Sequence, residues 1–198
     1  MFDSGYLRCP ACGILVCDPA LELTAVEKPA PCCGARGASR GLWPGLQAIK
    51  LLEIAESQDQ EQPEGHRIAV LFFASALEVM LEDVLVELLR QHTASEALSE
   101  AVLDCHQGVE RRRALFGRLS GTALGDLLME DWGQEFLRDW STLAARRNKV
   151  AHGSYYYRGS EDVVLIQRMR ASYLRAFVEM HNHVTRRAAV PSESGEPR

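Results

Sequence analysis

Arg147 and His152 are the two side chains of this sequence best suited to chemistry on a phosphodiester, and Asn148 lies beside the arginine. A guanidinium group binds two phosphate oxygens at once and keeps its charge at any physiological pH. An imidazole can both accept and donate a proton near neutral pH. Gly153 follows directly, which is typical of a helix end. The sequence therefore predicts a helix that ends with His152 at its last turn.

The same residues also have a purely structural explanation. Arginine and histidine near a helix C-terminus are favoured because they complement the negative end of the helix dipole. Spacing alone therefore leaves both interpretations open. On the expected helix, Lys149 is predicted to point away from the other three polar side chains and to contribute little.

The string RRNKVAHG resembles the R-x4-6-H signature of the HEPN superfamily of all-α domains, with Arg147, Asn148 and His152 filling its positions. The segment at 70–89, VLFFASALEVMLEDVLVELL, resembles the long early helix of such domains. The resemblance covers roughly residues 43–188. It implies a metal-independent endoribonuclease that cleaves RNA by attack of the 2′-OH on the adjacent phosphate. Two motifs would face one another in a homodimer.

The resemblance also implies a role for each residue. His152 would act as general base or acid, Arg147 would stabilise the phosphorane, and Asn148 would orient the imidazole or bind a phosphate oxygen. Two alternatives remain open. One is a catalytically inactive HEPN module that binds RNA, a nucleotide or partner proteins. The other is a toxin or antiphage defence component restrained by an antitoxin or another partner.

Two further residues are candidates for supporting roles. Glu78 lies among apolar positions of its expected helix, where a buried carboxylate would need a cation such as Arg147; a semi-exposed helix-edge position is the alternative. Tyr155 follows the motif. Some HEPN toxins carry R-x4-6-H-x-Y with a tyrosine that a partner nucleotidylates, but here the spacing is one residue longer. Packing of Tyr155, Tyr156 and Tyr157 over the bundle end is the alternative.

The first 33 residues contain five of the six cysteines. Cys9 and Cys12 form a C-P-x-C-G turn, and Cys32 and Cys33 precede Gly34 in a second, compressed turn. The segment resembles a zinc ribbon, which implies one structural Zn²⁺ held by these four thiolates. Because adjacent cysteines rarely bind one ion together, Cys17 is an alternative fourth ligand.

Disulfides or a ribbon that has lost its metal are the other interpretations of the cysteine pattern. Disulfides are disfavoured in a reducing compartment. A segment of about 40 residues without apolar periodicity needs a metal or a cross-link to fold. Cys105 stands apart in a helical stretch and is expected to be a small buried hydrophobic residue.

Apolar periodicity predicts helices at about 43–58, 65–93, 95–119 with an interruption near Gly108, 130–151 and 160–188. The fold class is therefore mainly α: a four- to five-helix, HEPN-like bundle at 41–190, preceded by a small zinc-ribbon β module at 1–40. Residues 191–198 are expected to be disordered. Five histidines are expected to be solvated: His66, His92, His106, His181 and His183.

Composition excludes some classes of protein. Charged residues make up 25% of the chain and the formal net charge is −5, which argues against a non-specific nucleic-acid coat but allows a local basic site. The longest apolar run is too short to cross a bilayer and no secretory leader is visible. We therefore expect a cytoplasmic protein that makes no membrane contact.

Overall fold

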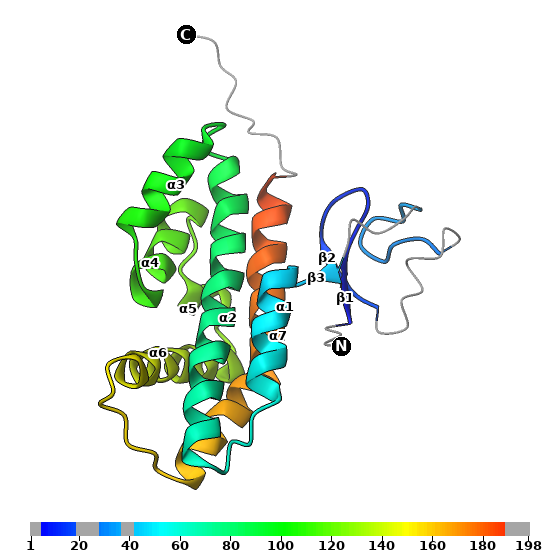
Figure 1. Ribbon diagram of the computed structural model, residues 1–198. Helices are drawn as coiled ribbons and strands as arrows, with labels where there is room; N and C mark the ends of the chain where they lie inside the picture. The colour runs from blue at the N-terminus through cyan, green and yellow to red at the C-terminus, as the bar shows by residue number, and fades with distance from the viewer. Residues whose placement is uncertain (1–4, 19–27, 37–41, 189–198) are drawn as a thin grey trace.

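The computed structural model describes residues 5–18, 28–36 and 42–188. Within them lie three short strands and seven helices (Figure 1). Their bounds are β1 Tyr6–Arg8, β2 Leu15–Cys17, β3 Leu42–Trp43, α1 Leu46–Glu56, α2 Pro63–Arg90, α3 Glu96–Cys105, α4 Val109–Ser120, α5 Leu124–Leu127, α6 Asp131–Ala151 and α7 Ser160–Ala188. The mainly helical fold class is confirmed.

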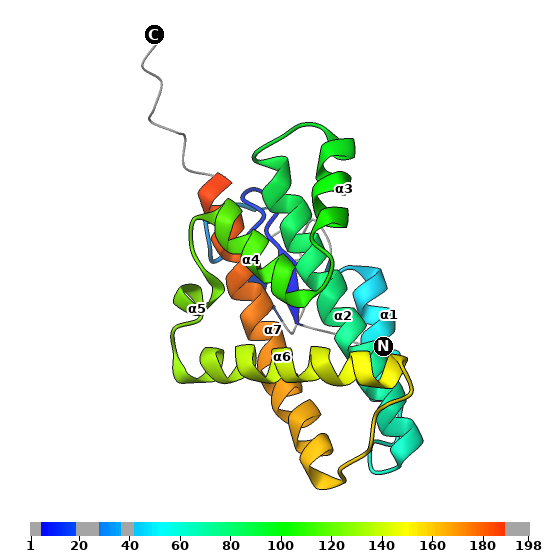
Figure 2. The same cartoon turned by 90° about the vertical axis from the view of Figure 1, so that its left-hand side faces the viewer.

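Helix α2 is the centre of the bundle. Pro63 occupies its first turn, where the missing N–H costs nothing. Thirteen of its residues are buried, and they recur every three to four positions from His66 to Leu89, so they form one broad apolar face. Helices α1, α6, α7 and α4 all contact it. In Figures 1 and 2, α1, α2 and α7 run side by side and α6 lies across them.

The interruption expected near Gly108 is confirmed, because the helical region predicted at 95–119 is divided into α3 and α4 at residues 106–108, and the short α5 follows them. One prediction about the helices needs correction. The first helix was expected from Trp43, but it begins at Leu46. Trp43 instead belongs to β3 and precedes a cis peptide bond to Pro44. A proline cannot donate to the ladder, so the strand stops there.

The strands form one antiparallel sheet in the order β2-β1-β3. The sheet thus extends to residues 42–43, just beyond the module at 1–40 that the sequence indicates. It is joined to the bundle through Asn182 of α7. The Asn182 side chain accepts a hydrogen bond from Leu15 N–H at 2.7 Å and donates one to the Leu15 carbonyl at 3.0 Å.

The segment predicted to be a disordered tail, 191–198, lies outside the described residues. None of the helices in the described part of the chain combines the length and apolar character needed to cross a bilayer.

Candidate functional site

Helix α6 ends as the sequence predicts. Gly153 has φ +68°, and its N–H donates to the Val150 carbonyl at 3.1 Å, while Ser154 N–H donates to the Lys149 carbonyl at 2.9 Å. These two bonds are those of a Schellman motif, which favours glycine at its left-handed position. His152 is the C-cap residue and its side chain is exposed. The candidate proton-transfer group is therefore open to solvent.

Arg147 points back into the protein from the last turn of α6. Its Nη2 lies 3.5 Å from Glu78 Oε2 of α2, which is the ion pair expected from the sequence. The two side chains are 35% and 24% exposed, so Glu78 is half-buried, and the pair is shielded but reachable from solvent. Nη1 of Arg147 also donates to Asn148 Oδ1 at 3.2 Å. The guanidinium is thus held in one orientation from two sides.

Arg147 and His152 lie on different sides of α6. Five residues at 3.6 residues per turn correspond to about 140° around the helix axis. Arg147 faces α2, whereas His152 lies three residues beyond Lys149 and close to its stripe. Within one chain, helix α6 therefore does not direct the side chains of Arg147 and His152 at a common point.

Lys149 lines a pocket of about 200 Å³ between the end of α6 and the loop at 152–159, and Arg147, Asn148 and His152 are not among its lining residues. The complete lining is Thr142, Ala145, Arg146, Lys149, Ser154, Tyr155, Tyr156 and Arg158. Lys149 and His152 are three residues apart and therefore neighbours at the helix end, whereas Arg147 lies on the opposite face of α6.

Tyr155 packs into the end of the bundle, the structural alternative considered for the tyrosine cluster. It is 6% exposed, and its hydroxyl donates to the fully buried Asp162 of α7. Asp162 also pairs with Arg146 of α6 and accepts the Arg158 N–H at 2.7 Å. Burial, and then the hydrogen bond to Asp162, raise the pKa of Tyr155. Asp162 therefore fixes the loop after His152 to both α6 and α7.

His66 is part of the same buried region, which contradicts its predicted solvation. It is fully buried and neither ring nitrogen has a hydrogen-bond partner among the described residues. Its ring centroid lies 6.0 Å from that of Tyr155 and 5.1 Å from that of Tyr157. Burial lowers the pKa of His66. Sequence reasoning missed both His66 and Asp162, because only the folded loop brings their partners to them.

The other histidines divide between surface and interior. His92 is exposed and His106 is half-buried. His181, expected at the surface, is 4% exposed and lies with its ring centroid 6.2 Å from that of Trp43. It is covered because the β module docks on this part of α7.

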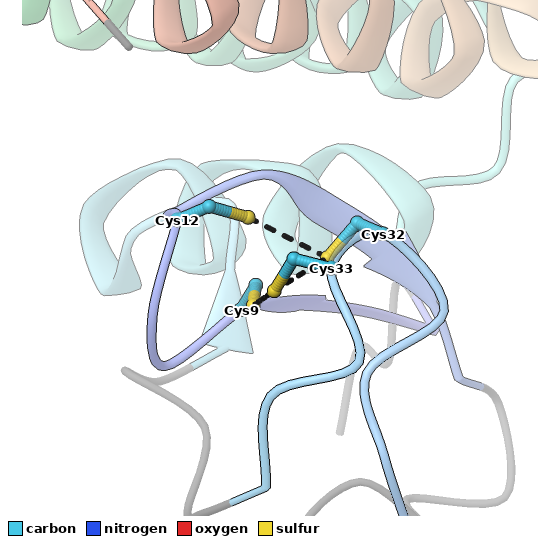
Figure 3. Close-up of side chains that lie close together, drawn as sticks. All are labelled: Cys9, Cys12, Cys32 and Cys33. Carbon is cyan, nitrogen blue, oxygen red and sulfur yellow. Dashed lines mark hydrogen bonds between the residues drawn. The ribbon is translucent and has the colours of Figure 1, made fainter.

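Four cysteines converge at the tips of two turns of the N-terminal module (Figure 3). The Sγ atoms of Cys9, Cys12, Cys32 and Cys33 all lie within 4.8 Å of one another. Cys9 and Cys33 are 3.5 Å apart, Cys12 and Cys32 3.5 Å, and Cys32 and Cys33 3.9 Å. Four thiolates at ~2.3 Å from one tetrahedral ion would be about 3.8 Å apart. The cluster therefore fits a metal ion such as zinc.

The geometry of the cluster also shows which cysteines can bind one metal ion together. Cys17 lies on β2, is exposed, and is not one of the four. The adjacent Cys32 and Cys33 both take part, because the turn from Ala30 to Gly34 directs both sulfurs inward. Burial disfavours ionisation of Cys9, but the backbone N–H groups of Cys12 and Ala11, together with hydrogen bonds from Cys32 and Cys33, outweigh it and lower the pKa of Cys9 to about 6.

All six cysteines are free thiols, so disulfides are absent from the described structure. Cys105, expected to be buried, is exposed at the end of α3. That helix lies at the edge of the bundle and buries only Leu103.

Comparison of the chain with protein-family models, with curated proteins and with solved structures finds no match.

Proposed function

We propose that this chain is an endoribonuclease of the HEPN type whose active site is completed by a second copy. The observation that carries the proposal is the end of α6. There Glu78 holds the half-buried Arg147 at 3.5 Å, and the Schellman turn leaves His152 exposed. A fixed cation and an accessible imidazole in one helix end are the two groups that phosphodiester cleavage needs.

The chemistry follows from these two groups. His152 accepts the proton of the RNA 2′-OH while the 2′ oxygen forms a bond to phosphorus. The bond from phosphorus to the 5′ oxygen then breaks, and the leaving oxygen takes a proton from a second imidazole. Arg147 donates hydrogen bonds to the phosphate oxygens, whose negative charge grows in the transition state. The products carry a 2′,3′-cyclic phosphate and a 5′-hydroxyl.

A second copy solves the geometric problem of the single chain. Arg147 and His152 diverge by about 140° on α6, whereas a two-fold axis at the helix ends would set the His152 of one copy against the Arg147 of the other. It would also supply the second imidazole. We propose a homodimer through the region 147–157, with the two helix ends of α6 facing one another.

The test uses purified protein and a panel of RNAs with and without EDTA. His152→Ala is expected to reduce the cleavage rate by roughly 10²–10⁴, because one well-placed acid–base group contributes that much. Arg147→Ala is expected to have a comparable effect. The control is His92→Ala, since His92 is also exposed but contacts the Leu119 carbonyl far from this motif in the chain. Equal cleavage by wild type and His152→Ala would contradict the proposal.

One observation favours a binding module without catalysis. The guanidinium of Arg147 already engages Glu78 and Asn148, so part of its charge is offset before any RNA arrives. In that case the protein would bind RNA or a nucleotide and leave it intact. A role as a toxin or defence component, restrained by a partner protein, would instead require that wild type but not His152→Ala arrests cell growth when expressed.

We propose that the four-cysteine cluster holds one structural Zn²⁺ in a zinc-ribbon-like module. The sulfur spacings of 3.5–3.9 Å match the edges of a tetrahedral Zn–thiolate site. A site with four thiolates has no open position, which is typical of a structural rather than a catalytic zinc. Elemental analysis of the purified protein is expected to give about one zinc per chain.

A further inference from the structure

The pocket of about 200 Å³ at the end of α6 has an unusual charge. Three of its lining residues are cations, namely Arg146, Lys149 and Arg158, and none is acidic. Arg146 is paired with Asp162 beneath it. Lys149 and Arg158 have no acidic partner within salt-bridge distance among residues 5–18, 28–36 and 42–188. Two uncompensated positive charges on one small pocket are most simply explained by an anionic ligand.

The larger neighbouring pocket does not share this property. It measures about 420 Å³ and also includes Thr142 and Arg146, but Glu161 lies on its wall. Its other cation, Arg168, donates two hydrogen bonds to Asp139 at 2.8 and 2.7 Å. The smaller pocket is therefore the more positively charged of the two and is better suited to bind an anion.

The size of the smaller pocket indicates which part of a ligand it holds. About 200 Å³ is below the ~300–1,000 Å³ usual for a pocket that encloses a whole small molecule. It suits a phosphate and part of a sugar, with the remainder outside. Tyr156 stands at this pocket with 86% of its surface exposed, and an exposed aromatic ring can stack on a nucleobase.

The pocket is also preorganised. Asp162 binds the Tyr155 hydroxyl, the Arg158 N–H and the Arg146 side chain, which fixes the loop and the floor. Lys149 is three residues before His152, so their Cβ atoms are about 5–6 Å apart. A phosphate bound by Lys149 would therefore lie next to the ribose 2′-OH from which His152 accepts a proton.

We propose that Lys149, Arg158 and Tyr156 form a subsite for the nucleotide that neighbours the scissile phosphate of a single-stranded RNA. Lys149 and Arg158 bind its phosphate, and Tyr156 stacks on its base. This inference rests on RNA being the substrate, as proposed above. It assigns a function to Lys149 that the sequence pattern did not predict.

Binding is measured separately from cleavage. A fluorescein-labelled single-stranded RNA of eight nucleotides is titrated with His152→Ala protein, which leaves the strand intact, and fluorescence anisotropy gives the Kd. Introducing Lys149→Ala and Arg158→Ala together into the His152→Ala protein is expected to raise Kd at least tenfold at low salt. The slope of log Kd against log salt should fall by about 1.4, because each phosphate contact on a single strand contributes ~0.7.

Matched control variants distinguish the effect of this pocket on Kd from the effect of positive charge elsewhere on the surface. Arg111→Ala with Arg118→Ala removes two exposed charges from α4 and is expected to change Kd less than twofold. Tyr156→Ala is expected to raise Kd on the order of tenfold, whereas Tyr156→Phe keeps the ring and should bind as the parent does. If both double variants weaken binding equally, the subsite is refuted.

Two further outcomes would overturn the proposal. Free AMP or UMP competing as strongly as the oligonucleotide would make the pocket a mononucleotide site. Failure of the parent protein to bind the oligonucleotide at low salt would remove the subsite altogether. Loss of binding in Lys149→Ala/Arg158→Ala supports the subsite even if wild type does not cut RNA, in which case the nuclease proposal alone fails.

Discussion

The substitution Asp162→Asn tests whether one buried carboxylate holds the candidate site together. Asp162 is fully buried and its partner Arg146 is 17% exposed, so little water reaches the pair. Asparagine keeps the shape and an oxygen for Tyr155 and Arg158 but removes the charge. Leaving a largely buried arginine without its counterion costs about 3–5 kcal/mol. For a chain of this length, each kcal/mol shifts Tm by roughly 2–4 °C, so the expected loss is about 6–20 °C.

The assay is urea unfolding at pH 7.5 with saturating zinc, followed by circular dichroism, for a double-mutant cycle. Asp162→Asn with Arg146→Met should cost less than the sum of the single changes, by about 1–3 kcal/mol, because the double variant leaves no unpaired charge. Glu87→Gln is the control, since its pair with Arg90 is 40% and 64% exposed and such pairs contribute at most about 1 kcal/mol. If Asp162→Asn costs no more than Glu87→Gln, the argument from burial is wrong.

Two other predictions concern the cysteines and the buried histidine. In the zinc-loaded protein a thiol reagent should titrate only Cys17 and Cys105, which are exposed and outside the cluster, and EDTA should make all six cysteines reactive. Equal reactivity of all six without chelator would refute the metal site. His66→Phe should raise Tm, and raise it more at pH 5.5 than at pH 7.5. Burial lowers the folded-state pKa of His66, so the unfolded chain takes up its proton first as pH falls below about 6.5 and stability is lost. Parallel plots of Tm against pH for wild type and His66→Phe would contradict this.

The sequence alone predicts the parts of the site that depend on local pattern. The period of apolar residues places α2, α6 and α7, and Gly153 marks the end of α6 because its positive φ is a local requirement. The pair of Glu78 and Arg147 could be expected because a carboxylate among apolar positions needs a cation. The helix positions and the helix end need no knowledge of how distant segments fold together, whereas the pair of Glu78 and Arg147 was expected from its chemistry alone.

The remaining features depend on tertiary contacts that no short pattern encodes. His66 looks like a surface residue until the loop at 152–159 folds over it, and Asp162 looks like an ordinary acidic residue in the first turn of a helix. The pocket that Lys149 lines could not be predicted, because the loop that closes it is irregular. Cys105 was expected inside because free cysteines are usually buried, but α3 lies at the edge of the bundle.

The contact between Asn182 and Leu15 has a consequence for self-association. In the order β2-β1-β3, β2 is an outer strand, and the N–H and C=O of Leu15 point away from β1. Open edges of this kind can recruit a strand from another molecule. The side-chain amide of Asn182 presents one donor and one acceptor, as a peptide group does, and occupies both positions. Helix α7 thereby closes the sheet edge, and Asn182→Leu would expose a template for edge-to-edge aggregation.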